Sequence, residues 1–320
     1  MNIRKDNNME LLAKVLPILL LFGAGFVMRK TQFLSQDVIN GFKKIVIDIA
    51  LPSVLFIAFV NLDFKIEYFG LILSVFILCI VMMVLGFLLR KLPIIQHPAL
   101  PFIVSGFSFG LLGIPLYITV FGEANLLPIA VMGIGHEFFI WFIYVSVMKF
   151  SMGKEKLSLD TIKGFLTSPL ILAIILGVGI NLLGLSHLLK DNYLLHGIYL
   201  TLESISKIAT PLILMVIGYG LSFNKAYAKL TIMFVALRFV LMLAVGYLFK
   251  FIIIDRLITF DHYMNYAYFT LLILPPPFSA SVLVGKYGGS DDQVKLVNNI
   301  TVVSTCLCIA TYIVYMFVTQ

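Results

Sequence analysis

Ten long apolar runs fill most of the chain, and this feature limits its fold more than any other. An α-helix needs about 20 apolar residues to span the hydrocarbon core of a bilayer. Only helices and closed barrels satisfy the backbone there, and a barrel strand needs only about ten residues. Runs of this length predict an all-α polytopic membrane protein with ten transmembrane helices, at 11–28, 38–60, 68–89, 98–121, 126–148, 162–185, 196–221, 230–254, 264–286 and 294–318.

The composition excludes a large soluble domain. The chain has 320 residues, of which 61% are hydrophobic and 12% charged, whereas soluble domains carry about 25% charged residues. The net charge of +7 does not indicate nucleic-acid binding, because the basic residues lie in short loops between apolar runs. Three cysteines lie inside apolar runs, where we interpret them as packing residues rather than disulfide or metal ligands: Cys79, Cys306 and Cys308.

The distribution of Lys and Arg predicts the orientation in the membrane. One set of loops holds fourteen of these residues and the opposite set holds seven. The richer side is expected to be cytoplasmic, which places both termini of a multi-pass cell-membrane protein outside the cytoplasm. The most polar connection lies near the middle of the chain, and we interpret residues 151–160 as a cytoplasmic linker.

The two halves of the chain resemble each other. Ile-Ala-Leu-Pro ends at Pro52 and Ile-Ala-Thr-Pro ends at Pro211, and the same offset of 159 residues relates Phe64 to Phe223. Five spans per half is an odd number, so the second half must enter the membrane from the opposite side. We therefore predict an inverted repeat, 1–150 and 161–320, which is typical of secondary transporters.

The fourth and ninth runs contain helix breakers at matching places. Gly110 and Gly113 precede Pro115 in the fourth run, and three consecutive prolines, 275–277, interrupt the ninth. We expect the fourth helix to unwind near mid-membrane, between Gly110 and Pro115. Paired interruptions of this kind indicate a transport site near mid-membrane. The half-helix N-termini there would present free N–H groups and a positive dipole end, which suits an anion.

These motifs resemble a known family. Gly110-x-x-Gly113-Ile-Pro115-Leu followed by Phe121-Gly resembles the signature of the auxin efflux carrier family, as do Ser168-Pro-Leu-Ile, the late Lys286-Tyr-Gly-Gly and Val302-Val-Ser-Thr. The resemblance covers essentially the whole chain, which looks like a compact prokaryotic permease of the kind associated with malate or malonate. One position departs from the family pattern, because Ser108 stands where the family often has Asn.

The resemblance implies a fold and a mechanism. Helices 4 and 9 would be broken and cross each other, as in bile-acid-symporter-like crossover folds. Helices 1, 2, 6 and 7 would form a scaffold, and helices 3–5 and 8–10 would move against it as an elevator. From the breaks and the resemblance together we expect the substrate to contact Ser108, Gly110, Gly113, Pro115, Pro276, Pro277, Ser279 and Asn299.

Four ionisable residues inside the spans are candidates for coupling or charge relay. Asp48 and Lys207 each lie four residues before the repeat-related proline, with opposite charge, and are hypothesised to pair near the pseudo-twofold axis. The alternative for Lys207 is a pair with Glu203 one turn away. His136 and Glu137 lie in the fifth run, where a proton-carrying role and a structural histidine are both open; the second His of a zinc-protease motif is absent.

The preferred function is therefore secondary transport of a small organic anion such as a carboxylate. A second possibility is H⁺- or Na⁺-coupled transport of another class of solute, and a third is a polytopic membrane enzyme. No nucleotide-binding loop or catalytic cluster is present in the sequence, so we expect no enzymatic activity and no cofactor. The expected partners are the anion, membrane lipid and H⁺ or Na⁺, with no nucleic acid; a homodimer through the scaffold helices is left open.

Overall fold

The computed structural model describes residues 2–62, 67–153, 163–164, 166–221 and 223–319. Within them the chain is all-helical, with 85% helix and no strand. The first half contains α1 (Asn2–Lys30), α2 (Gln36–Ile45), η1 (Val46–Ala50), α3 (Leu51–Val60), α4 (Glu67–Leu89), η2 (Pro93–Ile95), α5 (Leu100–Val104), η3 (Phe109–Gly113), α6 (Ile114–Phe121), η4 (Glu123–Asn125), α7 (Leu127–Phe138), η5 (Phe139–Tyr144), α8 (Val145–Met148) and η6 (Lys149–Gly153).

The second half begins after the segment predicted as a linker, most of which lies outside the described residues, as does Phe64. Its helices are α10 (Pro169–Leu182), η7 (Leu185–His187), α11 (Leu188–Asp191), α12 (Tyr193–Gly220), η8 (Lys225–Tyr227), α13 (Ala228–Phe249), η9 (Lys250–Ile254), α14 (Asp255–Leu257), α15 (His262–Ile273), α16 (Ala280–Lys286) and α17 (Asp291–Thr319).

Six helical stretches of the described chain are long and apolar enough to cross a membrane: Tyr68–Leu89, Leu100–Phe121, Leu127–Met152, Tyr193–Gly220, Lys225–Leu257 and Asp291–Val318. These correspond to six of the ten predicted runs. The sixth run forms the shorter apolar helix α10, and the ninth is split between α15 and α16. The second run combines α2, η1 and α3 and carries Lys43, Lys44 and Asp48. Many large apolar side chains remain exposed on the helices, as expected where lipid is the solvent.

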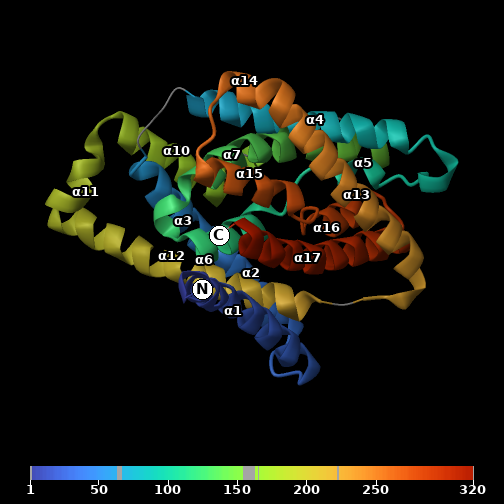
Figure 1. The fold of residues 1–320 in the computed structure, drawn as a ribbon, viewed down its shortest axis with the longest axis horizontal. Helices are drawn as coiled ribbons and strands as arrows, with labels where there is room; N and C mark the ends of the chain where they lie inside the picture. Colours follow the sequence, from blue (N-terminus) through green and yellow to red (C-terminus); the bar gives the residue numbers. More distant parts are fainter. Residues whose placement is uncertain (1, 63–66, 154–162, 165, 222, 320) are drawn as a thin grey trace.

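The helices form two neighbouring groups (Figure 1). In one, α1 lies along α12, and α10 packs on α3. In the other, α4 packs on α7, and α13 packs on α17. Small residues allow close approach within the first group, since a Cβ added to Gly218 would meet the backbone oxygen of Phe22 at 2.0 Å. The two groups meet where η3 and α6 contact α12 and α1.

Candidate functional site

The fourth run is broken, but upstream of the place predicted from its proline. The chain leaves helical geometry at Ser105–Ser108, and Gly106 adopts φ +68°, a conformation that favours glycine. Pro115 instead lies at the start of α6 and is buried. Because the preceding turn η3 is π-helical, with the Ile114 N–H bonded to the Phe109 carbonyl, the chain reaches Pro115 without unwinding there. The predicted break of the fourth run is present, but its predicted place between Gly110 and Pro115 was wrong.

The ninth run is broken where its prolines predict. Helix α15 ends at Ile273, and α16 begins at Ala280. Three consecutive prolines lack N–H groups, so no helical ladder can pass through them. All three are buried, whereas Ser279 is exposed at the N-terminus of α16. The break is therefore a buried, non-helical segment of backbone whose polar groups need partners from elsewhere in the fold.

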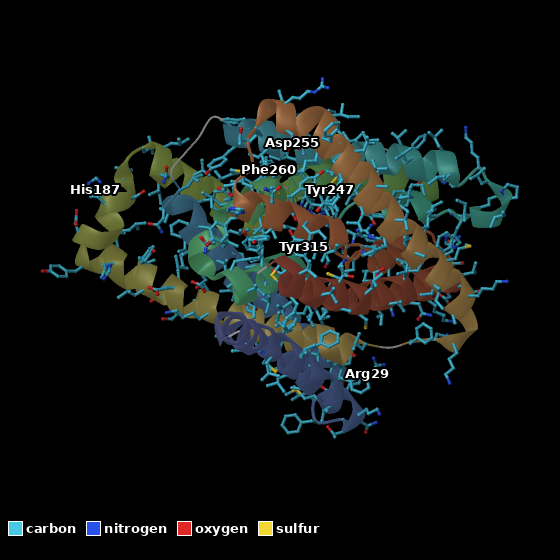
Figure 2. All side chains as sticks on the ribbon, viewed as in Figure 1. Arg29, His187, Tyr247, Asp255, Phe260 and Tyr315 are labelled. Atoms are coloured by element: carbon cyan, nitrogen blue, oxygen red, sulfur yellow. The ribbon has the colours of Figure 1, made fainter. Side chains whose placement is uncertain are left out.

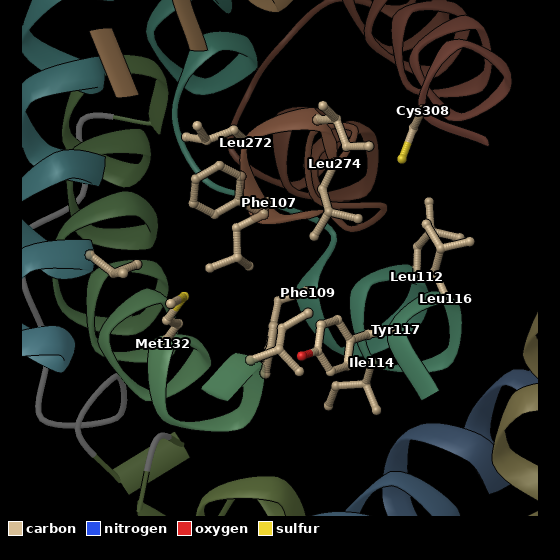
Figure 3. Close-up of a cluster of buried hydrophobic side chains, with 14 of the residues drawn as sticks. Phe107, Phe109, Leu112, Ile114, Leu116, Tyr117, Met132, Leu272, Leu274 and Cys308 are labelled. Atoms are coloured by element: carbon tan, nitrogen blue, oxygen red, sulfur yellow. The ribbon is translucent and has the colours of Figure 1, made fainter. Parts of the chain in front are cut away.

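The two breaks contact each other directly. The Ser108 N–H donates to the Pro275 carbonyl at 2.9 Å. A Cβ on Gly106 would lie 3.3 Å from Pro277, and one on Gly113 would lie 2.8 Å from Leu274. Figure 3 shows Leu274 beside Phe107, Phe109 and Leu112 in a buried apolar cluster. Two segments far apart in sequence, 105–108 and 274–279, thus contact each other, and this contact is called the joint below.

Two buried side chains bind the backbone groups that the breaks leave free. Arg238 of α13 donates to the carbonyls of Ile103, Gly106 and Leu274, the last two at 2.8 and 2.9 Å. His136 of α7 accepts the Phe107 N–H on Nε2 at 2.9 Å. Unpaired backbone groups are costly away from water, so these two residues are part of what allows the breaks to exist.

Other donors at the joint remain unused. The Ser108 hydroxyl is buried and has no hydrogen-bond partner. Among the hydrogen bonds of the described residues, none is donated by the N–H groups of Phe109, Gly110 or Leu111, which begin the continuous stretch of η3 and α6. A helix start with free N–H groups and a neighbouring free hydroxyl is suited to a negatively charged group.

Two cavities open at opposite ends of α12. The first, of about 280 Å³, is called the basic cavity here and is lined by Arg29, Gln36, Ile39, Asn40, Lys43, Leu111, Ile213, Val216, Ile217, Gly220, Leu221, Phe278, Ser281, Val282, Asn298, Thr301, Val302 and Thr305. The second, of about 380 Å³, is called the acidic cavity and is lined by Val54, Ile57, Ala58, Asn61, Leu62, Glu123, Ala124, Leu126, Leu127, Tyr199, Glu203 and Ser206.

The linings of the two cavities are related by the sequence offset between the halves. Five residues in or just after α3 line the acidic cavity, and the residues 159 positions later line the basic one: Val54 and Ile213, Ile57 and Val216, Ala58 and Ile217, Asn61 and Gly220, Leu62 and Leu221. Asn40 and Tyr199, also 159 apart, lie in opposite cavities. The two halves of the chain thus use equivalent helix faces to form the two openings.

The charges of the cavities differ in sign. Arg29 at the end of α1 (Figure 2) and Lys43 of α2 line the basic cavity, where the Arg29 guanidinium also donates to the Tyr219 carbonyl at 3.3 Å. Glu123 and Glu203 line the acidic cavity. The basic cavity reaches both broken helices, through Leu111 of η3 and through Phe278 and Ser281 beside and within α16. An anion entering this cavity would meet cationic side chains before it reached the joint.

A family comparison agrees with this architecture. A family model described as membrane transport protein, that of the auxin efflux carriers, matches residues 10–316. The chain belongs to this family. A search of curated proteins finds no match for it. Membership identifies a multi-pass membrane transport protein, and a transporter family agrees with the expectation that the chain is not an enzyme.

Most of the residues predicted to contact substrate lie at the joint and are not part of the lining of the basic cavity. Ser108, Gly110 and Gly113 lie in or beside the first break, and Pro276 and Pro277 lie in the second. Their sequence neighbours Leu111 and Phe278 line the basic cavity. Asn299 is already engaged, because its side-chain amide bonds to both the N–H and the carbonyl of Asn224, whereas Asn298 faces the cavity. The substrate contacts of this transport protein stay a prediction.

The candidate coupling residues are dispersed. Lys207 bonds to Glu203 at 3.0 Å, which is the local alternative, and none of the ion pairs of the described chain joins it to Asp48. Asp48 lies half-buried in η1. The His136 Nδ1 and the Glu137 carboxylate are 3.4 Å apart, too far for a good hydrogen bond. No group of three metal-ligating residues occurs in the described part of the chain.

Sequence reasoning could not identify the partners of two side chains at the breaks. The carbonyl partners of Arg238 could not be predicted from the sequence, since they lie 36 to 135 residues away. For His136 the sequence left a proton-carrying role and a structural role open, and the structure shows its Nε2 accepting the Phe107 N–H at the first break. The only usable signal was an Arg in an apolar run, which is costly and therefore rarely idle.

Proposed function

We propose that this protein carries a small organic anion, such as a carboxylate, across the cytoplasmic membrane by alternating access. The observation that supports it most is the joint between the two breaks, where the Ser108 hydroxyl and the first N–H groups of η3 are unused. These donors lie next to Leu111, which faces a cavity with two cationic residues. An anion bound there would receive hydrogen bonds and a favourable helix dipole.

The proposed architecture is a ten-helix inverted repeat of five plus five, with crossing broken helices. In it, runs 1, 2, 6 and 7 form a scaffold, and the remaining six form an elevator-like transport domain. The equivalent linings of the acidic and basic cavities support this, because alternating access requires two openings onto one site. The loop charges orient the basic cavity toward the cytoplasm and both termini outward.

Proteoliposome uptake tests the substrate class. Purified protein is reconstituted, and uptake of labelled malate, malonate and indole-3-acetate is measured against protein-free vesicles. We expect saturable uptake of at least one of these carboxylates, and competition by unlabelled acid but not by its neutral amide. Uptake of no carboxylate, together with uptake of a cationic or neutral solute, would overturn the anion assignment.

A proton-coupled mode is the second candidate, favoured by the position of His136. Its Nε2 accepts the Phe107 N–H, so a proton arriving at that nitrogen would remove the acceptor and disturb the first break. Imposing pH and Na⁺ gradients separately in the uptake assay distinguishes proton coupling, sodium coupling and uniport. Glu137→Gln and Asp48→Asn should abolish stimulation by a pH gradient if these carboxylates carry the proton. Unchanged stimulation in both variants would exclude them.

A further inference from the structure

Arg238 is a buried cation without a carboxylate partner. It lies within α13 and is 3% exposed. The ion pairs between side chains of the described residues are Lys207–Glu203 and Lys250–Asp255, and neither these nor the His136–Glu137 contact includes it. The ionisable groups around it are the hydroxyl of Tyr144 and the thiols of Cys79 and Cys308, which are uncharged at neutral pH. An arginine keeps its proton in proteins, so this part of the fold carries a fixed positive charge.

The guanidinium is placed at the ends of two half-helices. Ile103 belongs to the last turn of α5, Gly106 to the first break, and Leu274 is the C-cap of α15. The C-terminal carbonyls of a helix lack intrahelical partners and carry partial negative charge. The planar guanidinium of one side chain thus donates hydrogen bonds to carbonyls of both broken runs. A lysine, with a compact ammonium on a flexible stem, would not hold the same three carbonyls in a fixed arrangement.

The charge also lies close to the unused donors. Ser108 follows Gly106 by two residues, a span of at most about 7 Å, and the Gly106 carbonyl is 2.8 Å from the guanidinium. Ser108 itself therefore lies within about 10 Å of the positive charge, and an anion hydrogen-bonded to its hydroxyl lies within about 15 Å. At the effective dielectric constant of about 20 that suits protein sites, two unit charges at about 10–15 Å change a binding constant by roughly an order of magnitude.

We propose that Arg238 is a positioning and charge-selecting residue of this transporter. It holds the two breaks in register through their carbonyls, and its unneutralised charge favours an anion over a neutral solute at the joint. The positioning role stands on the hydrogen bonds alone, whereas the charge-selecting role rests on the proposed transport of an anion.

Hydrogen exchange tests the positioning role without any substrate. The amides of Phe107 and Ser108 report on the joint, because they donate to His136 and to the Pro275 carbonyl. In detergent or nanodiscs we expect Arg238→Gln to speed their exchange at least tenfold and Arg238→Lys to speed it less. Arg90→Gln is the control, because the Arg90 side chain contacts only the Phe87 ring among its described interactions. Unchanged exchange at Phe107 and Ser108 in Arg238→Gln would reject the positioning role.

Transport kinetics test the charge. For whichever of malate and malonate the wild type carries, we expect Arg238→Gln to raise KM about tenfold and Arg238→Lys to raise it less than threefold. The neutral diamide, which should not compete in the wild type, should not compete in either variant. If Arg238→Gln does not fold, Arg238→Lys still tests both roles, since it should raise KM less than threefold and lower the maximal rate because its ammonium holds the two breaks less well. Two results would overturn charge selection. One is an equal increase of KM in both variants, and the other is an unchanged KM in a folded Arg238→Gln. Absence of wild-type carboxylate uptake would instead count against the proposed function and leave the exchange result standing.

Discussion

Two serines of the first break have different hydrogen-bonding states. The Ser105 hydroxyl donates to the Pro101 carbonyl at 2.6 Å, whereas the Ser108 hydroxyl is buried without a partner. A buried hydroxyl without a hydrogen bond is unfavourable by about 1–3 kcal/mol relative to one in water. The hydroxyls of Ser146, Thr231 and Ser304 are also buried without a partner, but Ser108 lies beside the unused N–H groups of η3, which makes it the residue of choice for testing substrate contact.

Ser108→Ala should therefore separate stability from binding. We expect the melting temperature to stay the same or rise, because an unsatisfied hydroxyl is removed. KM for the transported carboxylate should rise roughly tenfold to a hundredfold, because one hydrogen bond to a charged group is lost. Ser105→Ala is the matched control and should leave KM unchanged. Equal KM values for wild type and Ser108→Ala would show that this hydroxyl does not contact substrate.

His136 provides a second residue-scale test. Replacing it with Phe removes the acceptor for the Phe107 N–H and leaves a buried donor unpaired, which should lower the free energy of unfolding by about 1–3 kcal/mol. His136→Gln retains an acceptor oxygen and should recover part of the loss. Thermal unfolding in one detergent measures both variants, and equal stability of His136→Phe and wild type would contradict this role.

At the scale of helices, the packing of α1 on α12 depends on particular glycines. Gly25 and Gly23 belong to the same G-x-G motif, yet only one lies in the contact. A Cβ on Gly25 would meet the Met215 carbonyl oxygen at 2.0 Å, whereas one on Gly23 would have no atom within 4 Å. Close backbone approach at small residues is a common basis of helix association in membranes, so the two glycines should respond oppositely to a methyl group.

Gly25→Ala should force α1 away from α12 and destabilise the protein by about 1–3 kcal/mol. Gly23→Ala should be neutral or stabilising by up to about 1 kcal/mol, because alanine has the higher helix propensity. Melting temperatures in detergent decide the comparison. Similar losses in both variants would mean that this helix contact does not depend on the close approach at Gly25.

At the scale of the whole molecule, the cavities at the two ends of α12 differ in charge. Arg29 and Lys43 line one, and Glu123 and Glu203 line the other. Charged side chains at a cavity opening change the local concentration of ionic substrates. This electrostatic effect is stronger at low salt, where screening is weaker. For an uncoupled carrier the overall equilibrium is unaffected, so the asymmetry should appear as a lower KM for anions on the basic side.

Lys43→Gln tests this electrostatic effect. We expect KM measured from the basic side to rise about twofold to fivefold at low ionic strength and the difference to shrink at about 0.15 M salt, where the Debye length is about 8 Å. Lys44→Gln is the matched control, because Lys44 is exposed and does not line the cavity. A KM that is insensitive to salt in the wild type would contradict a steering role for this cavity.

The sequence by itself determined the class of the protein and the presence of the interruptions. Apolar run length, charge depletion and consecutive prolines act locally, so they indicate membrane helices and a broken ninth run whatever the packing. The offset of 159 residues is likewise visible in the sequence and recurs in the two cavity linings. Only the tertiary structure decided where the fourth run unwinds, that Asn299 binds Asn224, and that Arg238 joins both breaks. All three features depend on which backbone groups are left unpaired in an apolar interior. Packing between segments far apart in the chain determines which groups those are.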